Sequence, residues 1–377
     1  MTVTNDECTA HQTLSYLSRL THTYMAYYTH ETIGDGPALG PRRPTINEFY
    51  LSSYTLNVYA GCEIGCPYCD GWAYIQRPLN EMVRVPTDMP QHLASELPAI
   101  DRGDLISITA LSDPYQPAEQ HYRLTRQVLQ QLAERGQPCT IMTKSADVLQ
   151  DISILQRLHE RGVALVLTTL LTIDPYLAAK LEGKAPPPGL RLSMLSELKR
   201  AGIPVGVAIL PIMPYVNDLD QSLRALLRAC AEAEVDFVFW DYLHIPNERH
   251  RIRITELMAR IGSYPASYLR DIYAGGPLVS EEYRRERDSE LLARCDGLGL
   301  EVRAPLRLYE GRLKPRNAIA LQLKAAAFRD RVQGRHHIAE LHRELAEQIY
   351  SGSAGLADLQ RSPLWPSLRL VAEQMGR

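Results

Sequence analysis

The chain has 377 residues, which suffices for one large α/β domain with additions or for two domains. With 45% hydrophobic and 23% charged residues it has the composition of a soluble globular protein, and no apolar run approaches the roughly 18 residues of a membrane span. A net charge of −3 argues against a large phosphate-tracking surface but leaves room for a local one. The first residues lack a basic region followed by an apolar one, so we expect a cytoplasmic protein with no membrane association.

The predicted elements follow in chain order. Residues 8–28 carry apolar and aromatic side chains at helical spacing and predict a helix, and the Gly/Pro-rich stretch 34–44 predicts a linker or extended arm. From about residue 52, strand-like segments alternate with amphipathic helical ones. Strands are expected at Thr55–Tyr59, Leu105–Ala110, Cys139–Lys144, Ala164–Leu170, Val205–Pro211 and Phe237–Tyr242. Helices are expected at Ala118–Arg135, Asp147–Arg161, Leu190–Ala201 and Leu219–Glu234.

This alternation predicts an α/β fold. Strands that alternate with helices are parallel and are joined by right-handed crossovers, and six of them favour a partial (βα)6 barrel. We expect an N-terminal helix and arm over 1–51, the barrel over 52–245, and a C-terminal, mostly helical extension over 246–377. The extension contains one further strand candidate, Leu300–Arg303.

Three closely spaced cysteines follow the first predicted strand. Cys62, Cys66 and Cys69 have the spacing Cys-x3-Cys-x2-Cys. Three thiolates can bind three irons of a [4Fe–4S] cube and leave the fourth iron open to another ligand. A structural zinc site usually has four protein ligands, and no second cysteine pair follows; seven cysteines in a chain of this length also make a disulfide framework unexpected. A non-catalytic iron–sulfur or zinc protein is the alternative from a different class.

Several sequence blocks accompany the cysteines. They are Leu-Asn-Val-Tyr-Ala-Gly-Cys at 56–62, Ser-Asp-Pro-Tyr-Gln-Pro-Ala-Glu at 112–119, Arg-Leu-Thr-Arg at 123–126, Thr-Lys-Ser at 143–145 and Gly-Ile-Pro-Val at 202–205, running to Pro-Ile-Met-Pro at 211–214. With these blocks the stretch 52–245 resembles the spore photoproduct lyase-like family of radical S-adenosylmethionine (SAM) enzymes. The resemblance implies a [4Fe–4S] cluster whose open iron binds SAM. It also implies reductive cleavage of SAM to a 5′-deoxyadenosyl radical, with flavodoxin or a ferredoxin as reductant.

The resemblance also implies contacts to SAM. Ser112 and Asp113 match the positions that contact the methionine ammonium, although an Asp before Pro also commonly opens a turn. Lys144 matches the position near the methionine carboxylate, and its alternative role is a solvated lysine at a strand end. Thr168 and Thr169 end the fourth predicted strand and are expected near the ribose, with Thr168 as the chosen candidate, although Val166 stands where the family often has serine. The run 209–213 is expected to form an apolar wall beside adenine, or simply a buried strand.

Two departures distinguish the chain from spore photoproduct lyases proper. Asp70 stands where those enzymes have a tyrosine, and Ala110 stands where they have a hydrogen-donating cysteine. Repair of thymine dimers by that route is therefore not expected. The sequence predicts hydrogen abstraction from a nucleoside or other small metabolite, with repair or modification of DNA or RNA as the alternative.

Residues near the barrel end and beyond it supply further candidates. Asp241, Tyr242 and His244 follow the sixth predicted strand and are expected either to contact substrate or to orient the extension. A basic run at 314–335 is expected either to engage phosphate or to form the solvated face of a helix; its members are Arg316, Lys324, Arg329, Arg331 and Arg335. Cys139, Cys230 and Cys295 are expected to be buried thiols.

Overall fold

The computed structural model describes residues 28–33, 36–74, 81–108, 111–262, 271–274 and 276–376. Nearly all of the predicted helix at 8–28, as well as Cys8 and Ala110, lies outside these residues. The last position of that predicted helix, Tyr28, begins a strand instead.

A sheet of six parallel strands confirms the predicted α/β barrel. Its order is β2-β4-β5-β6-β7-β8, so strands that follow one another along the chain are neighbours in space. The strands are β2 (Tyr54–Leu56), β4 (Ile106–Ile108), β5 (Cys139–Met142), β6 (Ala164–Thr169), β7 (Val205–Ile212) and β8 (Phe237–Tyr242). All six residues of β6 are buried, as expected where both faces of a parallel sheet are covered.

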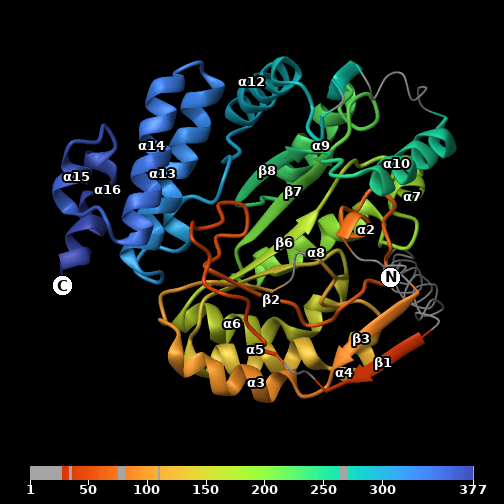
Figure 1. Cartoon of the computed structure of the whole chain (residues 1–377), viewed down its shortest axis with the longest axis horizontal. Helices are drawn as coiled ribbons and strands as arrows, with labels where there is room; N and C mark the ends of the chain where they lie inside the picture. The colour runs from red at the N-terminus through yellow and green to blue at the C-terminus, as the bar shows by residue number, and fades with distance from the viewer. Residues whose placement is uncertain are drawn as a thin grey trace, which may run out of the picture.

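Helices connect the strands and cover the outer face of the sheet, with α3, α5 and α6 together on one side (Figure 1). They are α3 (Met89–Glu96), α4 (Ala118–Tyr122), α5 (Leu124–Arg135), α6 (Ile152–Arg161), α7 (Pro175–Glu182), α8 (Pro188–Arg200) and α9 (Asp220–Glu232). The short 3₁₀ helices η2 (Leu97–Ala99) and η3 (Ala146–Asp151) precede β4 and α6.

One predicted helix is interrupted. The segment expected as Ala118–Arg135 breaks between α4 and α5 at Arg123, whose φ is 56°. The buried carboxylate of Glu119 explains the break, because it accepts hydrogen bonds from the backbone N–H groups of Thr125 (3.0 Å) and Arg126 (3.1 Å). Glu119 thus satisfies the free amides at the start of α5, which would otherwise have no partner.

A small second sheet forms from strands on either side of β2 in the chain. β1 (Tyr28–Thr32) pairs in parallel with β3 (Met82–Pro86), a pairing that the sequence analysis did not predict. The short helix α2 (Gly71–Tyr74) follows the cysteines. β3 also reaches the cysteine-containing loop, because Ala60 and Arg84 exchange backbone hydrogen bonds of 3.1 and 2.8 Å.

The Gly/Pro-rich arm packs against the barrel from residue 36 onwards. The backbone N–H groups of Ala38 and Leu39 donate to the carboxylate of Glu96 at 2.8 and 2.9 Å. Gly40 donates to the carbonyl of Thr55, and Leu39 is buried. Within its described residues the stretch is therefore an extended arm fixed to the barrel rather than a free linker.

The C-terminal extension is mostly helical, as predicted. It comprises α10 (Glu248–Ile261), α12 (Glu281–Leu298), η4 (Leu306–Leu308), α13 (Pro315–Val332), α14 (His336–Ser351), α15 (Leu356–Gln360), α16 (Trp365–Ala372) and η5 (Glu373–Gly376). The strand predicted at 300–303 is a short parallel pairing beside β8, in which Val238 donates to Glu301 and Arg303 donates to Val238. This pairing covers the edge of β8.

The extension shares a hydrophobic core with the barrel. Leu165 and Leu167 of β6 and Phe237 and Phe239 of β8 belong to one buried cluster with residues of α13 and α14, such as Leu323. α13 and α14 stand side by side against this part of the barrel (Figure 1). The other faces of the strands, including Val166, belong to a second cluster with the outer helices. The division at residues 51 and 245 stays a prediction. Among the described helices, none is long and apolar enough to span a membrane.

Leu323→Ala tests the shared core. Leu323 is fully buried, so truncation is expected to lower the free energy of unfolding by about 2–5 kcal/mol. Because barrel and extension share the cluster, intrinsic tryptophan fluorescence, to which Trp240 in β8 contributes, and overall helicity should report one common urea transition. Leu341→Ala on α14, at a side chain that is 51% exposed, is the control and should change stability by less than about 0.5 kcal/mol. Separate transitions for barrel and helices would contradict a shared core.

Candidate functional site

A cavity of about 450 Å³ opens at the carboxyl ends of the barrel strands. Its lining comes from every part of this edge, which is where parallel α/β architectures place their ligands. The lining includes Cys62, Cys66 and Cys69 from the loop after β2, Ser112 and Asp113 after β4, Lys144 after β5, Thr169 of β6, Leu210 and Pro211 of β7, and Asp241, Tyr242 and His244 at the end of β8. The structure therefore brings together all but one of the predicted cofactor and cysteine positions.

The three cysteines lie in a loop, residues 61–69, which we call the cysteine loop. Its first residue, Gly61, has a φ of +109°, and a Cβ there would lie 2.3 Å from the carbonyl oxygen of Met82. Only glycine fits this position, both for its backbone conformation and for the close approach of β3. The turn that begins the cysteine loop therefore requires the glycine at position 61.

The loop after β4, residues 111–117, anchors the cysteine loop. Gln116 is buried; its side-chain oxygen accepts from the backbone N–H of Glu63 at 2.8 Å, and its amide nitrogen donates to the carbonyl of Gly61 at 3.1 Å. In return, the buried carboxylate of Glu63 accepts from the backbone N–H of Ala118 at 2.9 Å. These three hydrogen bonds join two segments that are more than fifty residues apart in sequence.

The extension anchors the cysteine loop from its other end. The ring nitrogen Nε2 of His250 in α10 lies 3.1 Å from the carbonyl oxygen of Tyr68. Trp72 donates from its indole nitrogen to the carbonyl of Cys66 at 2.9 Å, and the guanidinium of Arg253 lies 3.4 Å from the Trp72 ring centroid. Helix α10 thus contacts Tyr68 directly and Cys66 by way of Trp72, which fixes the backbone between the second and third cysteines.

Asp113 holds the ends of β4 and β5 together. Its carboxylate accepts from the Thr143 hydroxyl at 2.6 Å, the Tyr115 backbone N–H at 2.9 Å and the Lys144 backbone N–H at 2.8 Å. Ser112 donates its hydroxyl proton to the carbonyl of Tyr59 at 2.8 Å. Both residues line the cavity, and both also fix the surrounding backbone. Their contact to the methionine ammonium stays a prediction.

Lys144 belongs to a buried charge network. Its ammonium lies 3.5 Å from Oε1 of Glu182, which also accepts the hydroxyl proton of Tyr68. Arg191 donates to Oε2 of Glu182 at 2.5 Å and to the carbonyl of Thr169 at 2.7 Å. Burial opposes the charge on Lys144, but Cys66 and Glu182 raise its pKa. Lys144 is therefore a fixed cation in the cavity wall beside Cys66, and its predicted contact with a carboxylate remains a prediction.

Thr168 and Thr169 lie on opposite faces of β6 because side chains alternate along a strand. Leu165 and Leu167 belong to the core shared with the extension, whereas Val166 belongs to the core under the outer helices. Thr168 follows the outer set, and its buried hydroxyl has no hydrogen-bond partner among the described residues. Thr169 follows the inner set and lines the cavity. The ribose contact predicted for Thr168 stays a prediction, and Thr169 is the better placed candidate.

The three thiols suit a cluster that supplies its own positive charge. Burial raises the pKa of Cys66 to about 11 and that of Cys69 to about 12, and it also raises the pKa of Cys62. Near neutral pH these sulfurs become thiolates only when cationic metal displaces their protons. In the described part of the chain, no three histidine, cysteine, aspartate or glutamate side chains converge on a point that one metal ion could occupy. The three thiols line one cavity, and three thiolates can each bind one iron of a cube, so the donor set fits a [4Fe–4S] cluster.

Several functional residues have no signal in the sequence. Tyr50 lines the cavity from the arm, and burial raises its pKa to about 12. Glu182 and Arg191 lie on α7 and α8 and reach the cavity wall only through the fold. The predicted substrate candidates Asp241, Tyr242 and His244 do line the cavity, as does the exposed Asp70. The thiols expected to be buried, Cys139, Cys230 and Cys295, are buried.

Comparison with known proteins finds similarity in sequence and in fold over the barrel. Residues 56–227 match the model of the radical SAM superfamily. An uncharacterised protein of Mycobacterium tuberculosis is 29% identical over 257 residues, covering 64% of this chain and 74% of the relative. An uncharacterised protein of Methanocaldococcus jannaschii is 23% identical, covering 58% and 78%. Spore photoproduct lyase complexed with dinucleoside spore photoproduct superposes with a TM-score of 0.56 at 12% identity, covering 73% of this chain and 81% of that one, which is a likeness of fold.

Gly61→Ala tests the turn that begins the cysteine loop. The added Cβ would clash with Met82, and the backbone would be strained, so we expect a loss of about 1–3 kcal/mol in the free energy of unfolding. Iron and sulfide bound per chain after anaerobic reconstitution should fall as well. Gly189→Ala is the matched control, because its Cβ meets open space at the start of α8. Equal iron content and stability in Gly61→Ala and wild type would show that the turn tolerates a side chain.

Glu182→Gln tests the buried charge network. It leaves Arg191 and Lys144 without their carboxylate, so we expect a loss of about 3–5 kcal/mol at pH 7 in urea denaturation. Although burial opposes its charge, Lys144 and Arg191 lower the pKa of Glu182 below 4.5. The carboxylate's contribution is therefore complete above pH 4.5 and is lost as pH falls through the lower, folded pKa.

The difference in free energy of unfolding between wild type and Glu182→Gln should accordingly become smaller in strong acid. Glu160→Gln, at an exposed position on α6, is the control. A Glu182→Gln protein as stable as wild type at pH 7 would refute a structural role for the network.

Proposed function

We propose that this protein, a radical SAM enzyme through its domain at residues 56–227, abstracts a hydrogen atom from a small organic substrate bound beside the cysteine loop. The substrate class is a nucleoside or other small metabolite. The observation that carries the proposal is a single cavity at the carboxyl ends of the strands. It joins the three cysteines, which follow the edge strand β2, to Asp241, Tyr242 and His244 at the opposite edge strand, β8.

The chain's own residues position and enclose the cofactors. When bound, a [4Fe–4S] cluster and SAM supply the one-electron cleavage that gives methionine and a 5′-deoxyadenosyl radical, which takes hydrogen from the substrate. Cys62, Cys66 and Cys69 would hold three irons. The ammonium of Lys144, which Glu182 fixes, would pair with the methionine carboxylate. Leu210 and Pro211 present apolar surface at the carboxyl end of β7, which suits adenine.

The cavity wall favours a small substrate. Tyr50 from the arm, Leu111 after β4 and Leu278 from the extension contribute to the lining, so segments from three parts of the chain border the same space of about 450 Å³. Such a space suits a small molecule better than a duplex, which would need an open and positively charged face. Asp70, which lines the cavity where spore photoproduct lyases have tyrosine, adds negative charge.

The reductant in this proposal is a flavodoxin or a ferredoxin. The third cysteine lies next to the surface, because Cys69 is half-buried and its neighbour Asp70 is exposed. At this edge of the cysteine loop, solvent comes close to one of the three sulfurs. We therefore place electron entry there.

Production of 5′-deoxyadenosine tests the proposed function. Anaerobically reconstituted and reduced wild-type protein is incubated with SAM, alone and with the low-molecular-mass fraction of a cell extract. We expect deoxyadenosine above the level of Cys66→Ala, and a further rise with the fraction, because substrate couples cleavage to turnover. Cys139→Ala, which removes a buried thiol remote from the cavity lining, is the matched control. Zinc in place of iron and sulfide, or deoxyadenosine no higher than in Cys66→Ala under both conditions, would reject the proposal.

A further inference from the structure

Helix α10 presents a row of charged side chains on one face. Arg249, Arg253, Glu256 and Arg260 follow one another at intervals of four, three and four residues, so they lie on the same side of the helix. We call these four residues the arginine stripe. Arg253 is half-buried and the other three are exposed. The stripe carries more positive than negative charge, although the whole chain has a net charge of −3.

The arginine stripe lies beside the cysteine loop. The guanidinium of Arg253 lies over the Trp72 ring, 3.4 Å from its centroid, and the indole N–H of Trp72 donates to the carbonyl of Cys66 at 2.9 Å. Figure 1 shows α10 next to α2, the helix that contains Trp72. One ring contact and one hydrogen bond therefore connect a cation of the stripe to the backbone of a cysteine that would hold the cluster.

The charges around the stripe do not neutralise it. Among the described residues, Glu248 pairs with Arg251 on the same helix, and neither Arg253 nor Arg260 forms an ion pair. Burial lowers the pKa of Arg253, and the other two arginines of the stripe lower it further, while Glu256 opposes them. Around Arg253, like charges therefore outnumber the opposite charge.

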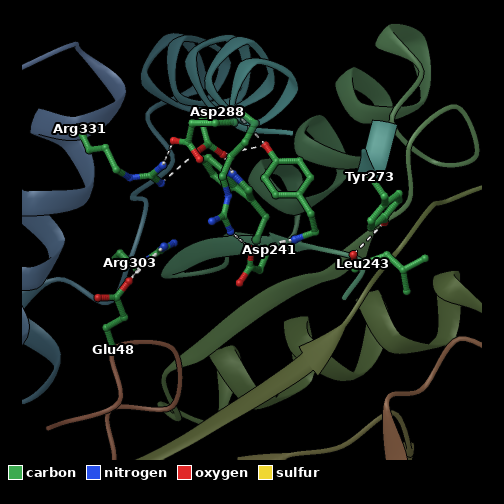
Figure 2. A network of polar contacts seen from close by, with 11 residues as sticks. Glu48, Asp241, Leu243, Tyr273, Asp288, Arg303 and Arg331 are labelled. Atoms are coloured by element: carbon green, nitrogen blue, oxygen red, sulfur yellow. Dashed lines mark hydrogen bonds and ion pairs between the residues drawn. The ribbon is translucent and has the colours of Figure 1, made fainter. Parts of the chain in front are cut away.

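Other arginines of the extension differ from the stripe because they have partners within the chain. Figure 2 shows one network of this kind, in which Arg303 contacts Glu48 and Arg331 pairs with Asp288. The arginines of the basic run at 314–335 all have hydrogen-bond or ion-pair partners, namely Arg316, Arg329, Arg331 and Arg335. These arginines stabilise the extension itself.

Apolar and aromatic side chains are exposed next to the stripe. Ile252 on α10 is 53% exposed, and Tyr74 at the end of α2 is 60% exposed. The side-chain amide of Asn247, which caps α10, donates to the carbonyl of Ala73 at 3.0 Å, so Tyr74 follows the point at which the two helices meet. Arginines beside exposed aromatic and aliphatic side chains are typical of a surface that binds another protein.

We propose that the arginine stripe docks an acidic ferredoxin that reduces the cluster. This inference rests on the proposed function and gives the reductant a binding face beside the cysteine loop. The reduced ferredoxin loses one electron and is thereby oxidised, and the cluster takes that electron. No covalent bond forms or breaks, and no proton moves.

A ferredoxin fits both the charge of the stripe and the reaction. Ferredoxins are one-electron carriers of low potential, which the reduction of a [4Fe–4S] cluster requires. Carboxylates on such a partner complement the positive stripe, and exposed charges of this kind speed association and are screened by salt. Small, weak interfaces are typical of electron-transfer complexes, whose partner leaves after each transfer. Trp72 lies between Arg253 and Cys66, so a partner on the stripe is next to the loop that would hold the cluster.

Titration of the reconstituted, oxidised protein with an oxidised, acidic [2Fe–2S] ferredoxin tests the docking face. We expect saturable binding that weakens as ionic strength rises, and that is at least about tenfold weaker in the double variant Arg249→Glu/Arg260→Glu. Arg249→Lys/Arg260→Lys keeps both charges and should bind within about twofold of wild type. Arg228→Glu reverses a charge at an exposed position on α9 and is the matched control, which should bind as wild type does.

Rates of cluster reduction separate docking from cluster assembly. Reduced ferredoxin should reduce the cluster at least about tenfold more slowly in Arg249→Glu/Arg260→Glu than in wild type. Dithionite, a small ion that needs no docking face, should reduce both proteins at similar rates. Equal iron and sulfide content in the two proteins shows that the variant folds and assembles its cluster, because both substitutions leave Arg253 and Trp72 in place.

Three results would overturn the assignment. The first is the absence of saturable binding, and the second is equal ferredoxin affinity in wild type and Arg249→Glu/Arg260→Glu. The third is a flavodoxin or a single-stranded oligonucleotide that binds more tightly than ferredoxin and loses its affinity in that variant. The titration needs neither SAM nor turnover, and the deoxyadenosine assay can use dithionite as reductant. A failure of docking therefore leaves the deoxyadenosine result standing, and a failure of deoxyadenosine production leaves the docking result standing.

Discussion

The hydrogen bonds between the cysteine loop and the loop after β4 are the constraint on which the site depends. The side chains of Gln116 and Glu63 each accept a hydrogen bond from a backbone N–H group of the opposite segment. Asp113 in turn accepts from the backbone N–H of Lys144 at the end of β5. The thiols, the turn after β4 and Lys144 are thereby held in one frame before any cofactor binds. Since buried polar groups cost free energy when they lose their partners, a change in any one of these side chains is felt at all three positions.

Electrostatics fixes one side of the cavity wall. The buried Glu182 holds Arg191 and Lys144 beside Cys66, so a cation faces that sulfur, while the carboxylates of Asp113 and Asp70 lie beside Cys62 and Cys69. The extension completes this frame, because it packs into the barrel core and anchors the cysteine loop through His250. It is therefore an integral part of the site.

Most of the barrel, and the edge where its site lies, could be predicted from the sequence. Hydrophobic runs placed all six strands, because strands buried on both faces leave a continuous apolar signal, and the cysteine spacing placed the site. The β1–β3 pair escaped because short partly exposed strands leave little pattern. The sequence did not predict the roles of Glu182, Arg191 and Tyr50, because these roles depend on contacts between distant segments. The choice between Thr168 and Thr169 requires knowing which side chains of β6 point toward the cavity. A strand that is buried on both faces shows no polar–apolar alternation from which this could be predicted. For the basic run at 314–335, only the structure shows that the arginines have hydrogen-bond or ion-pair partners whereas Lys324 has none among the described residues.

Centrally, we propose that Cys62, Cys66 and Cys69 hold a [4Fe–4S] cluster beside Lys144 and leave one iron open to SAM. Electron paramagnetic resonance of the reduced, reconstituted protein, recorded with and without SAM, tests this most directly. The account predicts the signal of one reduced [4Fe–4S] cluster per chain, with g values that change when SAM is added and change less in Lys144→Met. A signal identical with and without SAM, from a protein that carries its full complement of iron and sulfide, would contradict it.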